Sequence, residues 1–245
     1  MEHRALATPP LPQKIILVEH NPEPRDNGAS IWLAEQGFKL HWCQPFAGER
    51  LPSPTVEVAG VVILGGSQNI DEMSRSPFLA DEACWLETCL AQQIPVLGLC
   101  LGGQLLAHVL GAHVGPREDG TVEFGFYPIQ PAAQCADFVP DNFFVMQWHG
   151  RGFEVPAGAE ALAAGEVFPN QAFRYGDTAY GLQFHPECTL SVLRRWQEYE
   201  GAPWDKPGAQ NHGEQDRLAQ VHMATMHEWF TSLLGRLFCA TNPTI

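Results

Sequence analysis

The sequence has 245 residues, of which 45% are hydrophobic and 17% are charged, as in an ordinary globular protein. This length suits one α/β domain with a full hydrophobic core. Fourteen Lys and Arg residues against 28 Asp and Glu residues give a formal net charge of −14. Because such a surface repels phosphate backbones and anionic lipids, we expect neither nucleic acid nor a membrane as a partner.

The cysteines and histidines give no sign of a metal or redox centre. The seven cysteines include no CxxC pair. His108 and His113 are five residues apart, a spacing that does not align them on one helix face. Residues 1–13 lack the apolar stretch of a signal peptide and are interpreted as a loose N-terminal tail before a single domain at 14–245. We therefore expect a cytoplasmic protein with reduced thiols, no metal and no cofactor.

Short apolar runs alternate with helical patterns along the chain. They predict strands at 15–18, 39–43, 61–64, 95–99 and 179–184, and helices at 27–37, 78–92, 102–110, 189–200 and 215–238. In the first helix we expect Ile31, Leu33 and Ala34 to face inward. Residues 122–148 have a β-rich pattern, and residues 201–213 form a polar Pro/Gly loop. This alternation indicates an α/β fold, a parallel sheet covered by helices on both faces.

The segment 96–104 places Cys100 between a predicted strand and a predicted helix. Gly98 and Gly102 flank it, and their lack of Cβ atoms lets strand and helix approach closely around a sharp turn. At a helix N-terminus the macrodipole favours a thiolate, and the free N–H of Leu101 can stabilise an oxyanion. A buried structural cysteine in a glycine-rich turn, or the elbow of an α/β-hydrolase-like enzyme, fits this segment equally well.

A histidine and a glutamate follow the strand predicted at 179–184. In an extended segment residues two apart project to the same side, so His185 and Glu187 are expected to share a side. Pro186 favours this geometry by restricting the residue before it. Glu187 can then orient the imidazole while its other nitrogen faces a thiol. The acid follows the histidine here, whereas in α/β-hydrolases it precedes it.

Two glycines end the strand predicted at 61–64. The carboxyl ends of parallel strands are where ligands bind in open α/β sheets. A turn at Gly65 and Gly66 can offer a backbone N–H, most readily that of Gly66, as a second oxyanion donor. It does not fit a phosphate cradle, because neither a Lys nor a GxGxxG pattern accompanies it. An ordinary strand-to-loop turn is the alternative.

These three segments, together with Gln147-Trp148-His149-Gly150, resemble the class I glutamine amidotransferases. The closer resemblance is to free-standing proteins similar to the glutaminase domain of GMP synthase. It rests on the ordered segments 63–67, 98–104, 147–150 and 183–187. It implies a flavodoxin-like three-layer sandwich with a mainly parallel central sheet, and hydrolysis of glutamine through a γ-glutamyl thioester.

The resemblance also implies a role for particular residues. The catalytic triad would be Cys100, His185 and Glu187. The oxyanion would be held by Gly66 and Leu101. Contacts to the substrate would come from Gly65, Gln104, His149 and Gly150.

One position departs from the family pattern, and three functions stay open. Many relatives of the GMP synthase type continue His-Gly with an aspartate, but Arg151 follows Gly150 here. A basic group could attract a carboxylate of a γ-glutamyl peptide, and the loop 201–213 could cover the site. The first function is a glutaminase that feeds a separate ammonia-accepting synthase. The second is a stand-alone γ-glutamyl hydrolase or peptidase, and the third is a non-catalytic flavodoxin-like binding domain.

Overall fold

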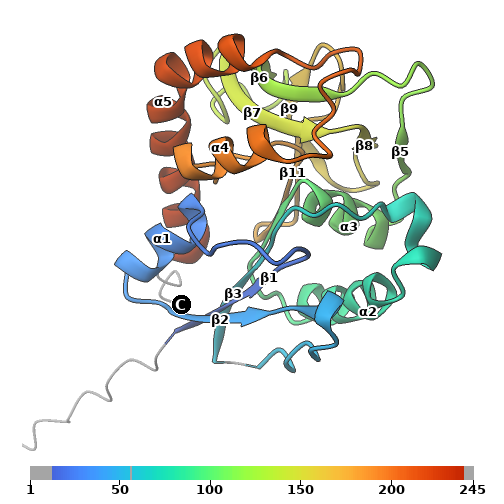
Figure 1. Ribbon diagram of the computed structural model, residues 1–245. Helices are drawn as coiled ribbons and strands as arrows, with labels where there is room; N and C mark the ends of the chain where they lie inside the picture. The colour runs from blue at the N-terminus through green and yellow to red at the C-terminus, as the bar shows by residue number, and fades with distance from the viewer. Residues whose placement is uncertain (1–12, 56, 240–245) are drawn as a thin grey trace, which may run out of the picture.

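The computed structural model describes residues 13–55 and 57–239. The predicted tail at 1–13 therefore lies, except for its last residue, outside the described residues. Within them, nine strands form one sheet in the order β2-β1-β3-β4-β11-β10-β9-β6-β7, and helices cover both of its faces (Figure 1). The predicted three-layer α/β sandwich is confirmed.

One half of the sheet is parallel and carries the predicted site. Its strands are β1 (Lys14–Val18), β2 (Lys39–Cys43), β3 (Val58–Ile63), β4 (Val96–Leu99) and β11 (Ala179–Leu182). All but β2 are almost wholly buried, as expected for strands with helices on both sides. Their carboxyl ends therefore converge at one edge, which is where ligands bind in such sheets.

The other half is antiparallel and accounts for the β-rich middle of the sequence. It consists of β6 (Glu123–Pro131), β7 (Phe143–His149), β9 (Glu160–Gly165) and β10 (Ala172–Tyr175). A separate two-stranded ribbon pairs β5 (Val114–Pro116) with β8 (Arg151–Phe153). The backbone N–H of His185 donates to the carbonyl of Met146 in β7, at 2.8 Å. This bond ties the end of the parallel half to the antiparallel half.

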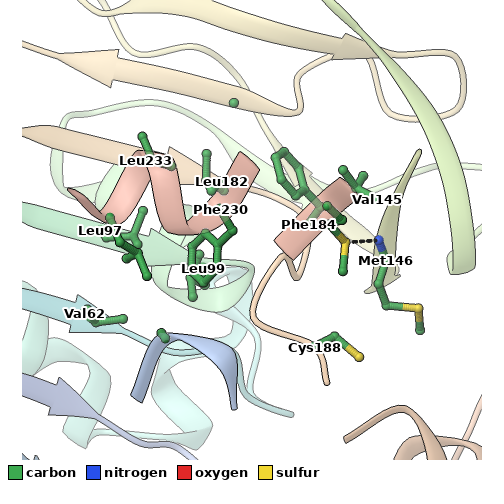
Figure 2. Packing of buried hydrophobic residues seen from close by; sticks show 14 of the residues in the cluster. Val62, Leu97, Leu99, Val145, Met146, Leu182, Phe184, Cys188, Phe230 and Leu233 are labelled. Atoms are coloured by element: carbon green, nitrogen blue, oxygen red, sulfur yellow. Dashed lines mark hydrogen bonds between the residues drawn. The ribbon is translucent and has the colours of Figure 1, made fainter. Parts of the chain in front are cut away.

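The helices divide between the two faces of the sheet. One face carries α1 (Gly28–Glu35), α4 (Leu190–Glu198) and α5 (His212–Phe238), and the other carries α2 (Phe78–Ala91) and α3 (Leu101–Val109). Two short 3-10 turns, η1 (Pro45–Ala47) and η2 (Ile70–Arg75), complete the fold. Figure 2 shows α5 packing Phe230 and Leu233 near Leu97, Leu99 and Leu182 of the sheet. Burial of these side chains is the main force that holds the layers together.

Two details of the sequence prediction are wrong. In α1 the buried residues are Ala29, Ser30 and Leu33, whereas Ile31 is 44% exposed and Ala34 is also exposed. Five of the eight residues of this helix have apolar side chains, and these point in several directions around it, so the pattern of hydrophobicity could not identify the inward face. In addition, α5 begins at His212, before the predicted start at residue 215.

The loop predicted at 201–213 therefore ends at Asn211. The Asn211 side chain accepts a hydrogen bond from the N–H of Glu214 and caps α5. The loop lies along β6: Gln210 exchanges side-chain hydrogen bonds with the backbone N–H and carbonyl of Phe126, at 2.9 and 2.6 Å. The Trp204 ring also packs edge-on against that of Phe124, with 4.7 Å between centroids. The loop is thus fixed to the antiparallel half of the sheet.

Candidate active site

Cys100 occupies a sharp turn between β4 and α3. Its φ of 50° lies in the left-handed region that few residues other than glycine adopt. Its N–H donates to the carbonyl of Leu182 at 2.8 Å, which fixes the turn to β11. A Cβ on Gly98 would stand 2.4 Å from the carbonyl oxygen of Gly102, and one on Gly102 would stand 2.2 Å from that of Ile63. Both glycines are therefore required by the close approach of strand and helix.

His185 and Glu187 form a buried hydrogen-bonded pair just beyond β11. Nδ1 of His185 lies 2.8 Å from Oε1 of Glu187, and each side chain is 6% exposed. The Glu187 carbonyl accepts from the N–H of Gly28 at 2.7 Å, so the start of α1 holds this segment in place. The arrangement leaves Nε2 of His185 as the nitrogen available for chemistry.

The imidazole of His185 and the side chain of Cys100 lie close together, because both flank the Cα of Gly65. Burial lowers the pKa of His185, but the charges of Glu187 and of the Cys100 thiolate outweigh it and raise this pKa well above 6.5. The thiol and imidazole predicted from distant segments therefore meet at the same edge of the sheet.

The Gly65-Gly66 turn lies beside both catalytic candidates. A Cβ on Gly65 would stand 2.7 Å from Cε1 of His185 and 3.6 Å from Cβ of Cys100. One on Gly66 would stand 2.7 Å from Cδ2 of Leu101. Leu101 is the first residue of α3, where backbone N–H groups have no partner within the helix. The two predicted oxyanion donors are therefore neighbours.

The side chains of Gln104 and His149 are engaged mainly by the protein. Nε2 of Gln104 donates to the Arg151 carbonyl at 3.0 Å and to Oε1 of Gln183 at 3.3 Å. Its Oε1 is the part that could meet a substrate. Nδ1 of His149 also faces the Arg151 carbonyl, at 2.8 Å, and its Nε2 lies 3.0 Å from the Glu123 carboxylate. A substrate near His149 would thus meet backbone atoms, such as those of the adjoining Gly150, and not the ring.

Sequence reasoning missed several neighbours of the sulfur and the imidazole. Nε2 of Gln183 and the carbonyl of Trp148 lie 3.8 and 3.7 Å from the Cys100 sulfur. The His185 ring meets the edge of Trp196, with 4.7 Å between centroids. Gln183 and Trp148 lie inside the motifs that carried the resemblance. The contact with Trp196 had no signal in the sequence, since a Trp in an amphipathic helix is interpreted as core.

Arg151, the departure from the family pattern, is paired with two acids of η2. Its Nε donates to Oδ1 of Asp71 at 2.5 Å, and its Nη2 lies 3.8 Å from the Glu72 carboxylate. Its side chain is 25% exposed. The positive charge that was expected to attract a substrate carboxylate is therefore already balanced by carboxylates of the protein.

The described part of the chain holds no group of three or more His, Cys, Asp or Glu side chains arranged to bind a metal ion. None of its helices combines the length and the apolar character needed to span a bilayer.

Comparisons with known proteins identify the family of this chain. The family model for glutamine amidotransferase class-I matches residues 33–195, which is more than half of the chain. The chain belongs to the class I glutamine amidotransferase family. A crystal structure of a glutamine amidotransferase from Thermotoga maritima matches with a TM-score of 0.83 and 31% identity, covering 93% of this chain and 98% of that one. This match agrees with the predicted flavodoxin-like sandwich.

Curated relatives point in the same direction. The glutamine amidotransferase-like protein YfeJ of Salmonella typhimurium is 29% identical over 178 residues, which cover 66% of this chain and 70% of that protein. A glutamine-hydrolyzing GMP synthase of Thermomicrobium roseum is 35% identical over 137 residues, which are 55% of this chain but only 24% of that enzyme. The chain is therefore similar to about a quarter of the length of that GMP synthase.

Proposed function

We propose that this amidotransferase hydrolyses the side-chain amide of glutamine through a γ-glutamyl thioester on Cys100. The observation that carries the proposal is the meeting of a strained elbow cysteine with the His185–Glu187 pair, whose nitrogen and oxygen are 2.8 Å apart. Such a thiolate–imidazolium pair is a nucleophile ready for acyl transfer.

In the first half of the reaction the Cys100 sulfur attacks the amide carbon of glutamine. The carbonyl oxygen becomes an oxyanion, which accepts hydrogen bonds from the N–H groups of Gly66 and Leu101. His185 donates its Nε2 proton to the departing nitrogen, and ammonia leaves as the thioester forms.

In the second half His185 takes a proton from water, which attacks the thioester carbonyl. The C–S bond breaks, and glutamate leaves with Cys100 returned to the thiolate. Glu187 keeps the imidazole in one orientation through both halves, because its carboxylate holds Nδ1.

The substrate's α-amino and carboxylate groups would bind beside the start of α3. Gly65 and Gly150 offer backbone groups there, and Gln104 offers its side-chain oxygen. The Gln104 side chain also donates a hydrogen bond to the Arg151 carbonyl, at 3.0 Å, and so holds the segment after His149 in place.

The direct test is release of ammonia from glutamine, with γ-glutamyl-anilide and glutathione as competing donors, by wild type, Cys100→Ser and Cys84→Ser. Cys84 is an exposed cysteine of α2 and serves as the matched control. Wild type and Cys84→Ser should release ammonia, and Cys100→Ser should not. Equal behaviour of all three proteins on all three donors would refute the enzymatic proposal, including its γ-glutamyl hydrolase form.

The same assay separates a glutaminase from a γ-glutamyl hydrolase or peptidase. The pairing of Arg151 with Asp71 and Glu72 removes the feature that favoured a peptide substrate. We therefore favour glutamine as the donor and a separate synthase as the acceptor of ammonia. A partner synthase should raise the rate of ammonia release, whereas faster turnover of glutathione by the isolated chain would favour the hydrolase.

A further inference from the structure

A buried histidine that the proposed reaction does not use lies behind the Gly65-Gly66 turn. His20 follows β1, and Nε2 of its ring lies 3.1 and 3.2 Å from the two carboxylate oxygens of Glu82 in α2. Both side chains are fully buried. Isolated buried charges are costly, so such a pair needs good geometry and further partners to persist.

The second ring nitrogen of His20 faces the glycine turn. Nδ1 lies 3.3 Å from the carbonyl oxygen of Gly65. Since a carboxylate and a carbonyl can only accept hydrogen bonds, both ring nitrogens must carry a proton for both bonds to form. Burial lowers the pKa of His20, but Glu82 and the nearby backbone carbonyls outweigh it and leave this pKa above 6.5. The two contacts therefore fit a ring that donates from both of its nitrogens.

The geometry of the peptide bond connects this contact to the active site. The carbonyl of Gly65 and the N–H of Gly66 belong to one planar peptide unit, and the described residues contain no cis bond. In a trans unit these two groups point in opposite directions. A Gly65 carbonyl held by His20 therefore turns the Gly66 N–H away from His20.

Among the described residues, no other hydrogen bond reaches the backbone of Gly65 or Gly66. Two consecutive glycines rotate more freely than any other residue pair. Cβ of His20 itself limits the space, because a Cβ on Gly66 would stand only 2.5 Å from it. A second contact comes from Gln68, whose Nε2 donates to the His20 carbonyl at 3.1 Å.

We propose that His20, oriented by Glu82, is a positioning residue that holds the Gly65-Gly66 peptide so that the Gly66 N–H faces the oxyanion formed at Cys100. The expected effect on ammonia release rests on the proposed function. The effect on the direction of the Gly65-Gly66 peptide does not. A flipped peptide would present a carbonyl oxygen to the oxyanion, and the first half of the reaction would lose one donor.

A matched pair of double variants tests the role of the donor. Glu82→Leu is combined with His20→Asn in one protein and with His20→Leu in the other. Neither protein retains an unpaired buried charge. Asn and Leu have nearly the same shape, but only Asn places an N–H donor where Nδ1 stood. Fold and stability are compared by circular dichroism and denaturant unfolding before any assay.

The expected result is a kinetic difference between the two variants. We call the His20→Leu, Glu82→Leu variant the Leu/Leu protein and the His20→Asn, Glu82→Leu variant the Asn/Leu protein. For ammonia release, kcat of the Leu/Leu protein should fall about 10- to 100-fold, because loss of one oxyanion donor slows catalysis by this order or more. KM should change little, and kcat of the Asn/Leu protein should stay within a few-fold of wild type. Alkylation of Cys100 by iodoacetamide forms no oxyanion, so its rate should be the same in both. Equal kcat values would overturn the proposal.

Crystal structures of the two variants test whether His20 holds the peptide without any measurement of ammonia release. The Gly65 carbonyl should keep its direction in the Asn/Leu protein and lose it in the Leu/Leu protein. The same direction in both would refute the proposal. If wild type hydrolyses none of the three donors, the proposed reaction fails, while these structures still determine whether His20 sets the direction of the peptide.

Discussion

Replacing Gly102 with alanine should damage both the stability of this protein and the reaction proposed for it. The added methyl carbon would stand 2.2 Å from the Ile63 carbonyl oxygen and 2.8 Å from its carbon, and both distances are well below the 3.4 Å at which ordinary contact begins. These are backbone atoms of β3, so no side chain can move aside. Either α3 or β3 must shift.

The expected cost is about 3 kcal/mol, the upper end of the usual range for overpacking a well-filled site. This is a large fraction of the 5–15 kcal/mol that holds a typical domain together. The shift would also move Leu101 and Cys100 at the start of α3. Since a misplacement of about 1 Å can cost on the order of 100-fold in rate, ammonia release should fall even in the folded fraction.

Gly235→Ala is the matched control. Gly235 lies inside α5, and among the described residues its added methyl would meet only Trp32, at 3.8 Å. Alanine there should stabilise the protein by about 0.5–1 kcal/mol, as in most helix interiors. Urea unfolding followed by tryptophan fluorescence measures both variants. If Gly102→Ala matches Gly235→Ala in stability and wild type in activity, the close approach of β3 and α3 does not explain Gly102.

Three further predictions concern other parts of the site and fold. In Glu187→Gln the pKa of His185 should fall, because the carboxylate that raises it is gone; NMR of labelled histidine should show this, and an unchanged pKa would contradict it. Asp26→Asn should cost roughly 0.5–1 kcal/mol at neutral pH, because its partly exposed pair with Arg195 is lost. Arg195 lowers the folded pKa of Asp26 below 3.8, so this stabilisation is present above pH 3.8 and is lost as pH falls through the folded value; a constant difference in unfolding free energy down to pH 2 would refute it. Gln210→Ala should cost about 2 kcal/mol, since it leaves two backbone groups of β6 without partners, and protease should then cut the 201–211 loop faster than in wild type.

Much of the fold and the assembly of the triad could be predicted because they depend on local patterns. Buried parallel strands have continuous apolar runs, and glycines on both sides of Cys100 indicate a tight turn. The i, i+2 relation places His185 and Glu187 on the same side, and the structure has them hydrogen-bonded. The catalytic roles of these residues stay predictions, since geometry alone does not test them.

What sequence could not supply are contacts between distant segments. The acid behind His149 is Glu123, from the neighbouring strand β6, and nothing in either segment specifies that partner. Likewise, His20 meets Glu82 across 62 positions of the chain. The cancellation of the charge on Arg151 by Asp71 also became visible only with the fold, because β8 and η2 are far apart in sequence.

The most direct test of the account is to find where the γ-glutamyl group goes during turnover. Wild-type protein is mixed with glutamine, quenched rapidly in acid and digested, and its peptides are analysed by mass spectrometry. The account predicts a glutamyl thioester on the peptide that contains Cys100, and neither adduct nor ammonia release in Cys100→Ser. A glutamyl group on another residue, or wild-type ammonia release by Cys100→Ser, would contradict it.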